Sequence, residues 1–321
     1  MLINGCNFLL LSSNHTAAML VVKHGFSRAR FYQFKKMSTF ITIKDLAKVV
    51  KSTDRQAKPV ILDVSVELSG NVDYRKRFVE SHIKGAQYFD FRHGTKPTET
   101  FPYNIPSPIC FQNYCQSFGI DNESDIVLYE AMPEERRLLI AGRVWWLFRY
   151  FGHEKVQVLD ATFKQWCSSK EAAGLTESGL AESPEAGTFK ATVCDHLLAD
   201  YKLVSSVSKS EANKRLVDTR TRETFAKSQI PNSVNIPWTT FFTGGEGFYS
   251  QLCQSDKVKE HYKDQNINVD KEEIIFSCQA GITACSGALI ASAAGIKNWR
   301  VYIGSLLDFK FNEKIDKKSS K

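Results

Sequence analysis

The stretch "IIFSCQAGITAC", from Ile274 to Cys285, decides which fold the chain is expected to adopt. It opens with two β-branched residues and an aromatic one, as in a strand that is buried on both faces of a sheet. Cys278 follows that strand. The small-residue segment "TACSGALIASAAG", from Thr283 to Gly295, then predicts a helix that ends at its glycine. The stretch therefore predicts a strand, a cysteine, a short loop and a helix.

The same order of elements occurs earlier in the chain, about 150 residues before, which is close to the length of one domain. There the apolar segment "DIVLYEA" (Asp125 to Ala131) precedes the helical pattern "LLIAGRVWWLFRYFG" (Leu138 to Gly152), which also ends at a glycine. Further segments that match between the copies are "VILDVS" with "RLVDTR", "SHIKGAQYFDF" with "SQIPNSVNIPW", and "KVQVLD" with "NWRVYIG". The chain is therefore predicted to contain one α/β unit twice.

Strands that alternate with helices favour a mainly parallel sheet with helices on both faces. The predicted fold class is accordingly α/β, with two tandem domains. A segment rich in Ser, Gly, Glu and Ala separates the copies and is interpreted as a linker. The predicted organisation is a leader or targeting segment at 1–38, a first domain at 39–167, a linker at 168–200, a second domain at 201–312 and a basic tail at 313–321.

The positive charge of the chain lies at its two ends. The sequence has 42 Lys and Arg against 35 Asp and Glu, a formal net charge of +7. Residues 1–36 contain five basic residues and no acid, and residues 310–321 contain five lysines against Glu313 and Asp316. The part between them is close to neutral, so no nucleic-acid partner is predicted.

The acid-free first segment allows two interpretations. Its composition fits a mitochondrial transit peptide, and it also fits a leader ahead of a second start at Met37, where "MSTFITIKDLAKVV" begins a domain. The protein is therefore expected to be mitochondrial or cytoplasmic, depending on whether translation starts at Met1 or at Met37.

The eight cysteines form no C-x-x-C pair, which argues against a zinc ribbon and against a secreted disulfide scaffold. A reducing compartment is expected, and neither a metal nor a cofactor is predicted. The sequence contains no uninterrupted apolar run of about 18 residues, so neither a membrane-spanning helix nor a membrane partner is predicted.

Cys278 is the candidate nucleophile. Groups beyond the carboxyl ends of parallel strands meet backbone N–H donors of the loop and the positive end of the next helix. Gly281 is expected to let the loop curl with a positive φ, and Thr283 is expected to cap the helix. Such donors favour an exposed thiolate and suit a persulfide, whose negative charge persists. The alternative is an inert cysteine buried at the end of a strand.

These segments resemble the rhodanese family, and the tandem form is similar to thiosulfate and 3-mercaptopyruvate sulfurtransferases. The resemblance covers about residues 40–309 and rests above all on "GRVWWLFRYFGHEKVQVLDATFKQW", "VDTRTRETF" and "CQAGIT". It implies a sulfurtransferase that moves sulfane sulfur from thiosulfate or 3-mercaptopyruvate to cyanide or a thiol. In that family the first domain lacks the nucleophile, which agrees with Glu130 at the matching strand end.

The resemblance also implies the residues of the site and its partners. Cys278 would carry the sulfur as a persulfide, without a cofactor. Arg143 and Arg149 match positions that hold the carboxylate of mercaptopyruvate, for which a guanidinium is suited; otherwise they are ordinary charges on a helix surface. The partners would be a small anionic sulfur donor and a thiol or cyanide acceptor, with a thioredoxin-like protein as one candidate. The persulfide loop would consist of Gln279, Ala280, Gly281, Ile282 and Thr283.

Several supporting positions depart from the family pattern. Gln279 and Ala280 supply neither the hydroxyl nor the cations that the loop usually carries, and Tyr103 stands where a first-domain histidine is expected. A second function is therefore kept: a degenerate rhodanese-fold protein that binds an anion, a persulfide or a protein with little turnover. A thiol phosphatase is excluded, because its Cys-x5-Arg loop needs an arginine where this chain has Ala284.

Two further residues are given structural interpretations. His82 is expected to fix a turn. Cys285 is expected to pack inside its helix, because the loop must bend away between it and Cys278, which argues against a regulatory disulfide.

Overall fold

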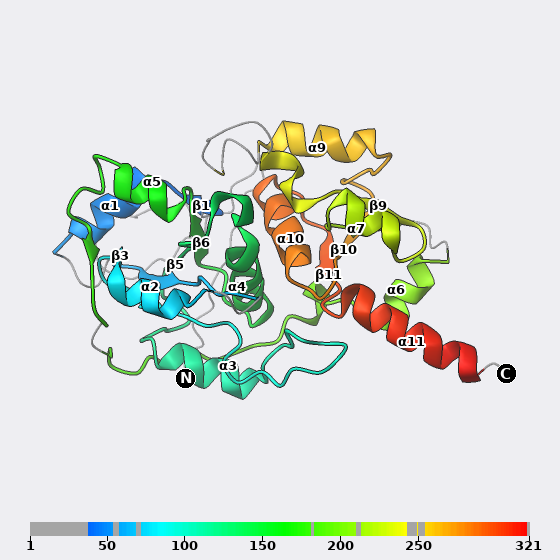
Figure 1. The fold of residues 1–321 in the computed structure, drawn as a ribbon, viewed down its shortest axis with the longest axis horizontal. Helices are drawn as coiled ribbons and strands as arrows, with labels where there is room; N and C mark the ends of the chain where they lie inside the picture. Colours follow the sequence, from blue (N-terminus) through cyan, green and yellow to red (C-terminus); the bar gives the residue numbers. More distant parts are fainter. Residues whose placement is uncertain are drawn as a thin grey trace, which may run out of the picture. The chain divides into compact units, whose positions relative to one another are not determined.

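The computed structural model describes residues 38–53, 58–68, 72–180, 183–209, 213–242, Tyr249 and 254–319. All but the last residue of the predicted leader or targeting segment at 1–38 lies outside these described residues. Ser38–Lys321 form one compact unit, which contains both copies of the repeated pattern. We call the elements from β1 to β7 the first half and those from η3 to α11 the second half (Figure 1).

The first half is built on a five-stranded parallel sheet with the order β1-β6-β5-β2-β4. A short antiparallel pair, β3 with β7, lies outside it. The elements of this half are β1 (Phe40–Ile41), α1 (Ile43–Lys51), β2 (Val60–Asp63), α2 (Tyr74–Glu80), β3 (His82–Ile83), β4 (Ala86–Tyr88), α3 (Pro108–Gln116), β5 (Ile126–Tyr129), η2 (Glu134–Arg136), α4 (Leu139–Tyr150), β6 (Val156–Leu159), α5 (Phe163–Ser168) and β7 (Thr176–Glu177).

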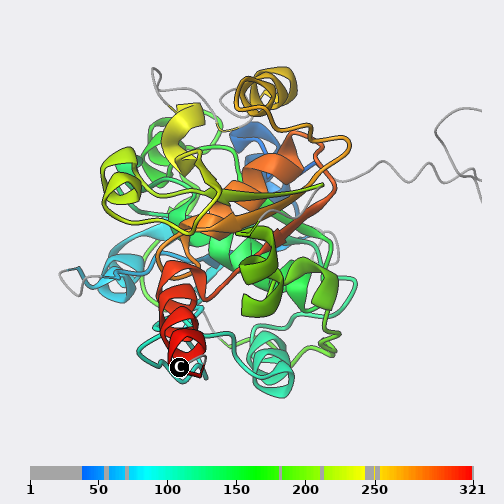
Figure 2. The ribbon, with the colours of Figure 1, turned by 90° about the vertical axis from the view of Figure 1, so that its right-hand side faces the viewer.

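The second half is built on a four-stranded parallel sheet with the order β11-β10-β8-β9. Figure 2 views this half directly, with α11 leading to the C-terminus. Its elements are η3 (Asp195–Leu197), α6 (Tyr201–Val207), β8 (Lys214–Asp218), α7 (Arg222–Lys227), β9 (Ser233–Asn235), η4 (Trp238–Phe242), α9 (Ser255–Asp264), β10 (Glu273–Ser277), α10 (Thr283–Ala293), β11 (Trp299–Val301) and α11 (Ser305–Ser319).

The two sheets correspond strand by strand. The order β6-β5-β2-β4 of the first half matches β11-β10-β8-β9 of the second, and β2 and β8 both end in an aspartate, Asp63 and Asp218. An isolated parallel bridge between Leu198 and Val301 lies where the first half has β1. The predicted duplication and the α/β fold class are therefore confirmed.

Residues alternate between the two faces of each sheet, as buried parallel strands require. In the first sheet, Leu62 faces a core shared with α3 and α4, whereas Ile61 faces a core shared with α1, α2 and α5. In the second sheet, Phe276 faces the former core together with α9 and α10, and Ile275 faces a third core with α6 and α11. Helices thus cover both faces of both sheets.

One core runs through both halves because α4 and α10 pack on each other (Figures 1 and 2). The approach is close: a Cβ added to Gly142 would lie 2.8 Å from Cα of Ser286. The hydroxyl of Ser286 also donates to the carbonyl of Leu138 at 2.8 Å. Both helices end as predicted, because Gly152 and Gly295 follow them with φ values of +84° and +80°.

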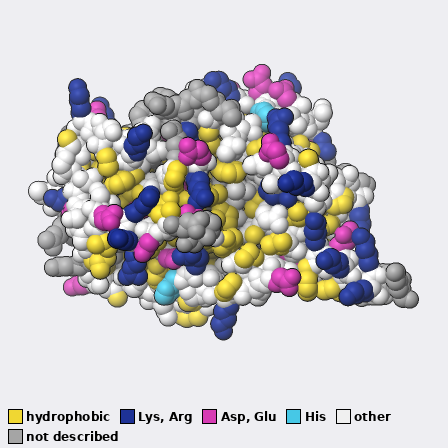
Figure 3. All heavy atoms as spheres, in the orientation of Figure 1, with side chains coloured by type: hydrophobic (Ala, Val, Ile, Leu, Met, Phe, Trp, Pro, Cys, Tyr) yellow, Lys and Arg dark blue, Asp and Glu magenta, His cyan; other side chains and the backbone are white. Residues whose placement is uncertain are grey.

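The segment predicted as a linker packs along the first half. Phe189 is fully buried, and its N–H donates to the carbonyl of Ile120 at 3.0 Å. The segment predicted as a basic tail continues α11 as far as Ser319. No helix in the described ranges is long and apolar enough to cross a membrane. On the face drawn in Figure 3, Lys and Arg side chains are spread among acidic and neutral ones.

Candidate functional site

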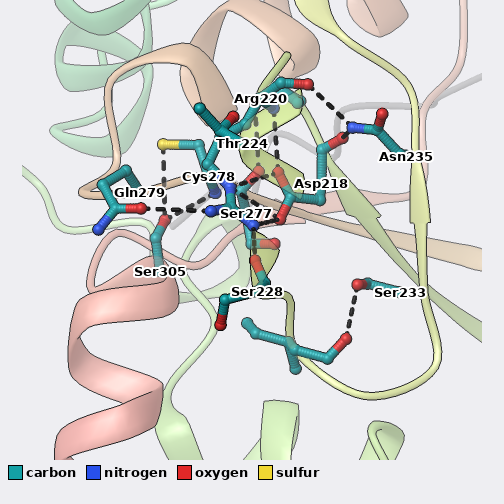
Figure 4. Close-up of polar contacts among 12 residues, drawn as sticks. Asp218, Arg220, Thr224, Ser228, Ser233, Asn235, Ser277, Cys278, Gln279 and Ser305 are labelled. Atoms are coloured by element: carbon teal, nitrogen blue, oxygen red, sulfur yellow. Dashed lines mark hydrogen bonds and ion pairs between the residues drawn. The ribbon is translucent and has the colours of Figure 1, made fainter. Parts of the chain in front are cut away.

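Cys278 lies directly after β10, at the carboxyl end of a central strand of the second sheet (Figure 4). Its sulfur accepts a hydrogen bond from the N–H of Gly281 at 3.1 Å. Its own N–H donates to the hydroxyl of Ser305 at 3.0 Å, and its carbonyl accepts the N–H of Leu306 at 3.1 Å. The persulfide loop and the start of α11 therefore hold the cysteine from two sides.

Ser305 is a residue of the site that the sequence did not indicate. Its hydroxyl lies 3.7 Å from the sulfur of Cys278 and 2.7 Å from the carbonyl of Tyr302, which is the better acceptor. Its φ of +50° places it in the left-handed region, which serine rarely adopts. Strained residues of this kind gather at functional sites, so this feature agrees with a functional position for the sulfur beside it.

Gly281 gives the loop its shape. Its φ is +80°, as predicted, and a Cβ at this position would lie 2.4 Å from the carbonyl oxygen of Ile303. The prediction for Thr283 was wrong. Ile282 occupies the N-cap of α10 without a side-chain hydrogen bond, and Thr283 is the first residue of the helix. The hydroxyl of Thr283 instead lies 2.8 Å from the hydroxyl of Thr219, so it ties the helix to the end of β8.

The sulfur is less accessible than the sequence suggested. Cys278 is only 3% exposed and belongs to the core that α4 and α10 share. Gln279 is exposed and Ala280 is half-buried, so the loop meets solvent through these two residues. The thiol thus combines the predicted N–H donor with a buried position, which differs from the exposed thiolate that was expected.

Arg143 reaches the persulfide loop, but its guanidinium is occupied by backbone carbonyls. Nη1 donates to the carbonyl of Gly281 at 3.4 Å, and Nη2 donates to the carbonyl of Tyr103 at 2.8 Å. The residue is fully buried, and its guanidinium carbon lies 5.3 Å from the ring centre of Trp146. This placement does not support the expected contact with a carboxylate. It makes Arg143 a link between the two halves.

Arg149 lies near the other end of α4. Its guanidinium is 3.6 Å from the carboxylate of Glu154 and 5.9 Å from the ring centre of Trp145. Among the described residues, these contacts of Arg149 do not involve the persulfide loop. Because six residues on a helix span more than one turn, Arg143 and Arg149 leave α4 at different points, and the structure does not bring them together.

Arg220 is a second cation that reaches the loop, and sequence reasoning did not single it out. Its Nη2 lies 2.6 Å from the carboxylate of Asp218, and its Nη1 donates to Oε1 of Gln279 at 3.3 Å (Figure 4). Arg220 and Asp218 are 7% and 0% exposed. The available signal is the segment "VDTR", which matches a strand end of the other copy and contributes to the family resemblance without indicating a site role for Arg220.

Cys285 packs in α10, in agreement with its interpretation as a helix residue. Its thiol donates to the carbonyl of Gly281 at 3.2 Å, and Nη1 of Arg143 lies 3.8 Å from its sulfur. Burial raises the pKa of this thiol to about 12, although Arg143 acts in the opposite direction. Cys278 and Cys285 are both free thiols.

His82 holds the turn between α2 and β3, as interpreted. Its Nδ1 lies 2.7 Å from the carbonyl of Phe78. The imidazole ring also stacks on the ring of Phe78, with centroids 3.9 Å apart. The described residues contain no cluster of three His, Cys, Asp or Glu side chains that would hold a metal ion.

The first half has a carboxylate where the second has its thiol. Glu130 follows β5 as Cys278 follows β10, and its Oε1 accepts the N–H groups of Ile140 and Ala141 at 2.5 and 2.7 Å. Burial raises the pKa of Glu130 to about 7, while these backbone donors act in the opposite direction. The first half therefore presents a buried acid to the start of α4, and no sulfur.

Comparisons with known proteins agree with this geometry. A family model described as Rhodanese-like domain matches residues 45–169 and 203–312. The thiosulfate sulfurtransferase of Rattus norvegicus is 30% identical over 277 residues, which cover 83% of this chain and 89% of that protein. The 3-mercaptopyruvate sulfurtransferase of Mus musculus is 29% identical over 249 residues, which cover 74% of this chain and 80% of that protein.

Solved structures share the fold. The 3-mercaptopyruvate sulfotransferase SseA from Escherichia coli superposes with a TM-score of 0.70 at 24% identity, covering 84% of this chain and 99% of that one. Tum1 protein from Saccharomyces cerevisiae superposes with a TM-score of 0.72 at 19% identity, covering 87% and 97%. Together with the two family matches along the sequence, these findings establish that the chain belongs to the rhodanese-like family and contains two rhodanese-like domains.

Proposed function

We propose that this protein is a sulfurtransferase that carries sulfane sulfur on Cys278. The observation that carries the proposal is the 3.1 Å hydrogen bond from the N–H of Gly281 to the Cys278 sulfur at the end of β10. A backbone donor aimed at sulfur stabilises a thiolate, which is the nucleophilic form. The same donor can stabilise the terminal charge of a persulfide.

The reaction consists of two displacements at one sulfur atom. The Cys278 thiolate attacks the outer sulfur of the donor, so that a new S–S bond forms and the S–S bond of thiosulfate, or the C–S bond of 3-mercaptopyruvate, breaks. Sulfite or the enolate of pyruvate leaves with the electron pair, and the enolate then takes up a proton. An acceptor nucleophile next attacks the outer sulfur of the persulfide and releases the thiolate, which gives ping-pong kinetics.

The donors proposed here are thiosulfate and 3-mercaptopyruvate, because relatives of this chain bear those names. Gln279, Ala280, Gly281, Ile282 and Thr283 form the proposed persulfide loop, and the exposed side of Gln279 is the side on which a donor would enter. We propose that Arg143 acts by holding the carbonyl of Gly281. We do not propose that Arg143 or Arg149 contacts the donor. The proposed acceptor is cyanide or a thiol, with a thioredoxin-like protein as one candidate.

Intact-mass spectrometry tests the proposal directly. The protein is incubated with thiosulfate or with 3-mercaptopyruvate and weighed, and we expect a gain of one sulfur atom. The gain should be absent in Cys278→Ser and retained in Cys167→Ser, which removes an exposed cysteine of α5. An unmodified mass with both donors, or a gain that persists in Cys278→Ser, would refute the proposal.

A second candidate is favoured by the burial of the sulfur. Cys278 is 3% exposed and the loop carries neutral Gln279 and Ala280, so a domain that binds an anion, a persulfide or a protein with little turnover is also compatible with the site. The same experiment separates the two. The binding module predicts that an anionic donor protects the loop from hydrogen exchange without any transfer of sulfur.

We propose that residues 1–36 direct the protein to mitochondria when translation starts at Met1, and that a start at Met37 leaves it in the cytoplasm. A fluorescent protein fused after residue 38 would test this, because the two starts should then give different distributions.

A further inference from the structure

Glu130 stands where the second half has its nucleophile. β5 and β10 occupy matching places in their sheets, and Glu130 and Cys278 are the residues that follow them. The match extends to the backbone, because the carbonyl of Glu130 accepts the N–H of Phe163 at 3.4 Å and that of Cys278 accepts the N–H of Leu306 at 3.1 Å. The end of β5 therefore has the same backbone arrangement as the end of β10, although it carries no thiol.

The side chain of Glu130 holds the beginning of α4. Its Oε1 accepts the N–H groups of Ile140 and Ala141, which belong to the first turn of that helix. Leu138, at the N-cap, has a φ of +58° and makes no side-chain capping hydrogen bond. Glu130 is 5% exposed, and its Oε2 has no hydrogen-bond partner among the described residues. A carboxylate from another strand thus replaces the missing cap at the positive end of the helix.

The same turn of α4 leads directly to the persulfide loop. Gly142 follows Ala141 and lies against Ser286 of α10, where no space for a Cβ remains. The next residue, Arg143, donates to the carbonyl of Gly281 at 3.4 Å. Gly281 in turn gives its N–H to the sulfur of Cys278. The carboxylate of the first half is therefore connected to the sulfur of the second through one helical turn and one guanidinium.

We propose that Glu130 is a positioning residue for the persulfide loop, which it orients through the first turn of α4 and Arg143. The expected effect on the rate of persulfide formation rests on the proposed sulfur transfer at Cys278. The expected effect on the structure of the loop does not. Glu130, which occupies the nucleophile's position in the first half, thus supports the nucleophile of the second half.

The charge of Glu130 is expected to vary close to neutral pH, because burial raises its pKa to about 7. The titratable groups that interact with it electrostatically are Asp63 at the end of β2 and Tyr74 of α2. The ionised carboxylate holds the N-terminal amides of α4 more strongly than the neutral acid does, because its charge complements the positive end of the helix. Glu130→Gln keeps an acceptor oxygen but stays neutral at every pH.

Hydrogen exchange of the loop amides tests the structural step without any reaction. At pH 8 we expect the amide of Gly281 to exchange about tenfold faster in Glu130→Gln and in Arg143→Met than in the unaltered protein. Glu154→Gln, which removes an exposed carboxylate beyond the far end of α4, should leave the rate unchanged. Equal exchange in Glu130→Gln and the unaltered protein would overturn the proposal, whether or not the protein transfers sulfur.

The rate of persulfide formation tests the kinetic step. The ratio of rate constants, unaltered protein to Glu130→Gln, should rise from about two at pH 6 to about nine at pH 8. In a double-mutant cycle, Glu130→Gln should cost nothing further once Arg143→Met is present. A ratio independent of pH, or additive losses, would contradict a role through Arg143. Failure of the unaltered protein to form any persulfide would refute the proposed function instead.

Discussion

Arg220 donates from Nη1 to Oε1 of Gln279 at 3.3 Å, and this contact fixes which end of this exposed amide faces Arg220. The amide NH2 of Gln279 is left to point elsewhere, where it can donate to an incoming oxygen. Arg220 in turn is held by the carboxylate of Asp218 and by the carbonyl of Ser228 at 2.7 Å. A buried ion pair thus supports the one exposed side chain of the loop.

Arg220→Met should destabilise the protein strongly, because it leaves the buried carboxylate of Asp218 without its cation. The expected loss in the free energy of unfolding is about 3–5 kcal/mol. The chain offers a matched control, because Arg92 pairs with Asp90 in the same Asp-x-Arg arrangement. Nη2 of Arg92 lies 2.7 Å from Oδ2 of Asp90, but the Arg92 side chain is 44% exposed. Arg92→Met should cost less than about 1 kcal/mol. Urea denaturation measures both, and similar losses for the two variants would contradict this account.

Gly281→Ala should distort the persulfide loop. The φ of +80° disfavours any side chain by about 1–2 kcal/mol, and the new Cβ would lie 2.4 Å from the carbonyl of Ile303, which belongs to the backbone and cannot rotate away. Gly85 is the control, because it has the same φ of +80° with no atom within 4 Å of a Cβ. We expect Gly281→Ala to lose about 1–3 kcal/mol more in unfolding free energy than Gly85→Ala. Equal losses in thermal or urea unfolding would show that the contact is unimportant.

The architecture was predictable because its signals are local. The apolar runs around Ile126 and Ile274, the helix patterns that follow them and the closing glycines Gly152 and Gly295 each depend on a few neighbouring residues. The place of Cys278 at a strand end follows from the same patterns, since parallel strands present their carboxyl ends along one edge.

The contacts across the molecule were not predictable in this way. Arg143 and Gly281 are separated by 138 residues, so no spacing in the sequence reveals that one holds the carbonyl of the other. Thr283 has the residue type of a cap, but its hydroxyl faces Thr219 from another element, and this tertiary contact overrides the local preference. The burial of Cys278 likewise depends on how closely α4 and α10 approach, which the missing side chain of Gly142 and the short one of Ser286 permit.

Cys285 should remain unmodified when the native protein is treated with iodoacetamide at pH 8. It is fully buried, and burial raises its pKa to about 12, so very little of the reactive thiolate is present or accessible. Cys167 is exposed and should be alkylated before Cys285, although partial burial raises the pKa of Cys167 as well. Peptide mass spectrometry reads both sites, and protein unfolded in urea serves as the control in which both should react. Labelling of Cys285 in the native protein would mean that α10 opens readily.

Glu130 should make stability depend on pH in a direction opposite to that of most carboxylates. Its pKa is raised by burial from 4.5 to about 7, so between these values the folded protein keeps a proton that the unfolded chain has released. The free energy of unfolding therefore falls as the pH rises through this window, by about 3 kcal/mol from this group. Glu130→Gln removes the dependence, and the contribution of Asp63, whose pKa burial raises to about 6, largely cancels between the two proteins.

We accordingly expect the stability of Glu130→Gln, relative to the unaltered protein, to improve by about 3 kcal/mol between pH 4.5 and pH 8. Urea denaturation at both pH values measures this difference, and Glu154→Gln should show none because its carboxylate is exposed. If Glu130 also positions the persulfide loop, the same substitution should raise this relative stability and lower the rate of sulfur transfer at pH 8. A substitution that merely damages the fold would lower both, so the two opposite signs identify a buried charge that is retained for function at a cost in stability.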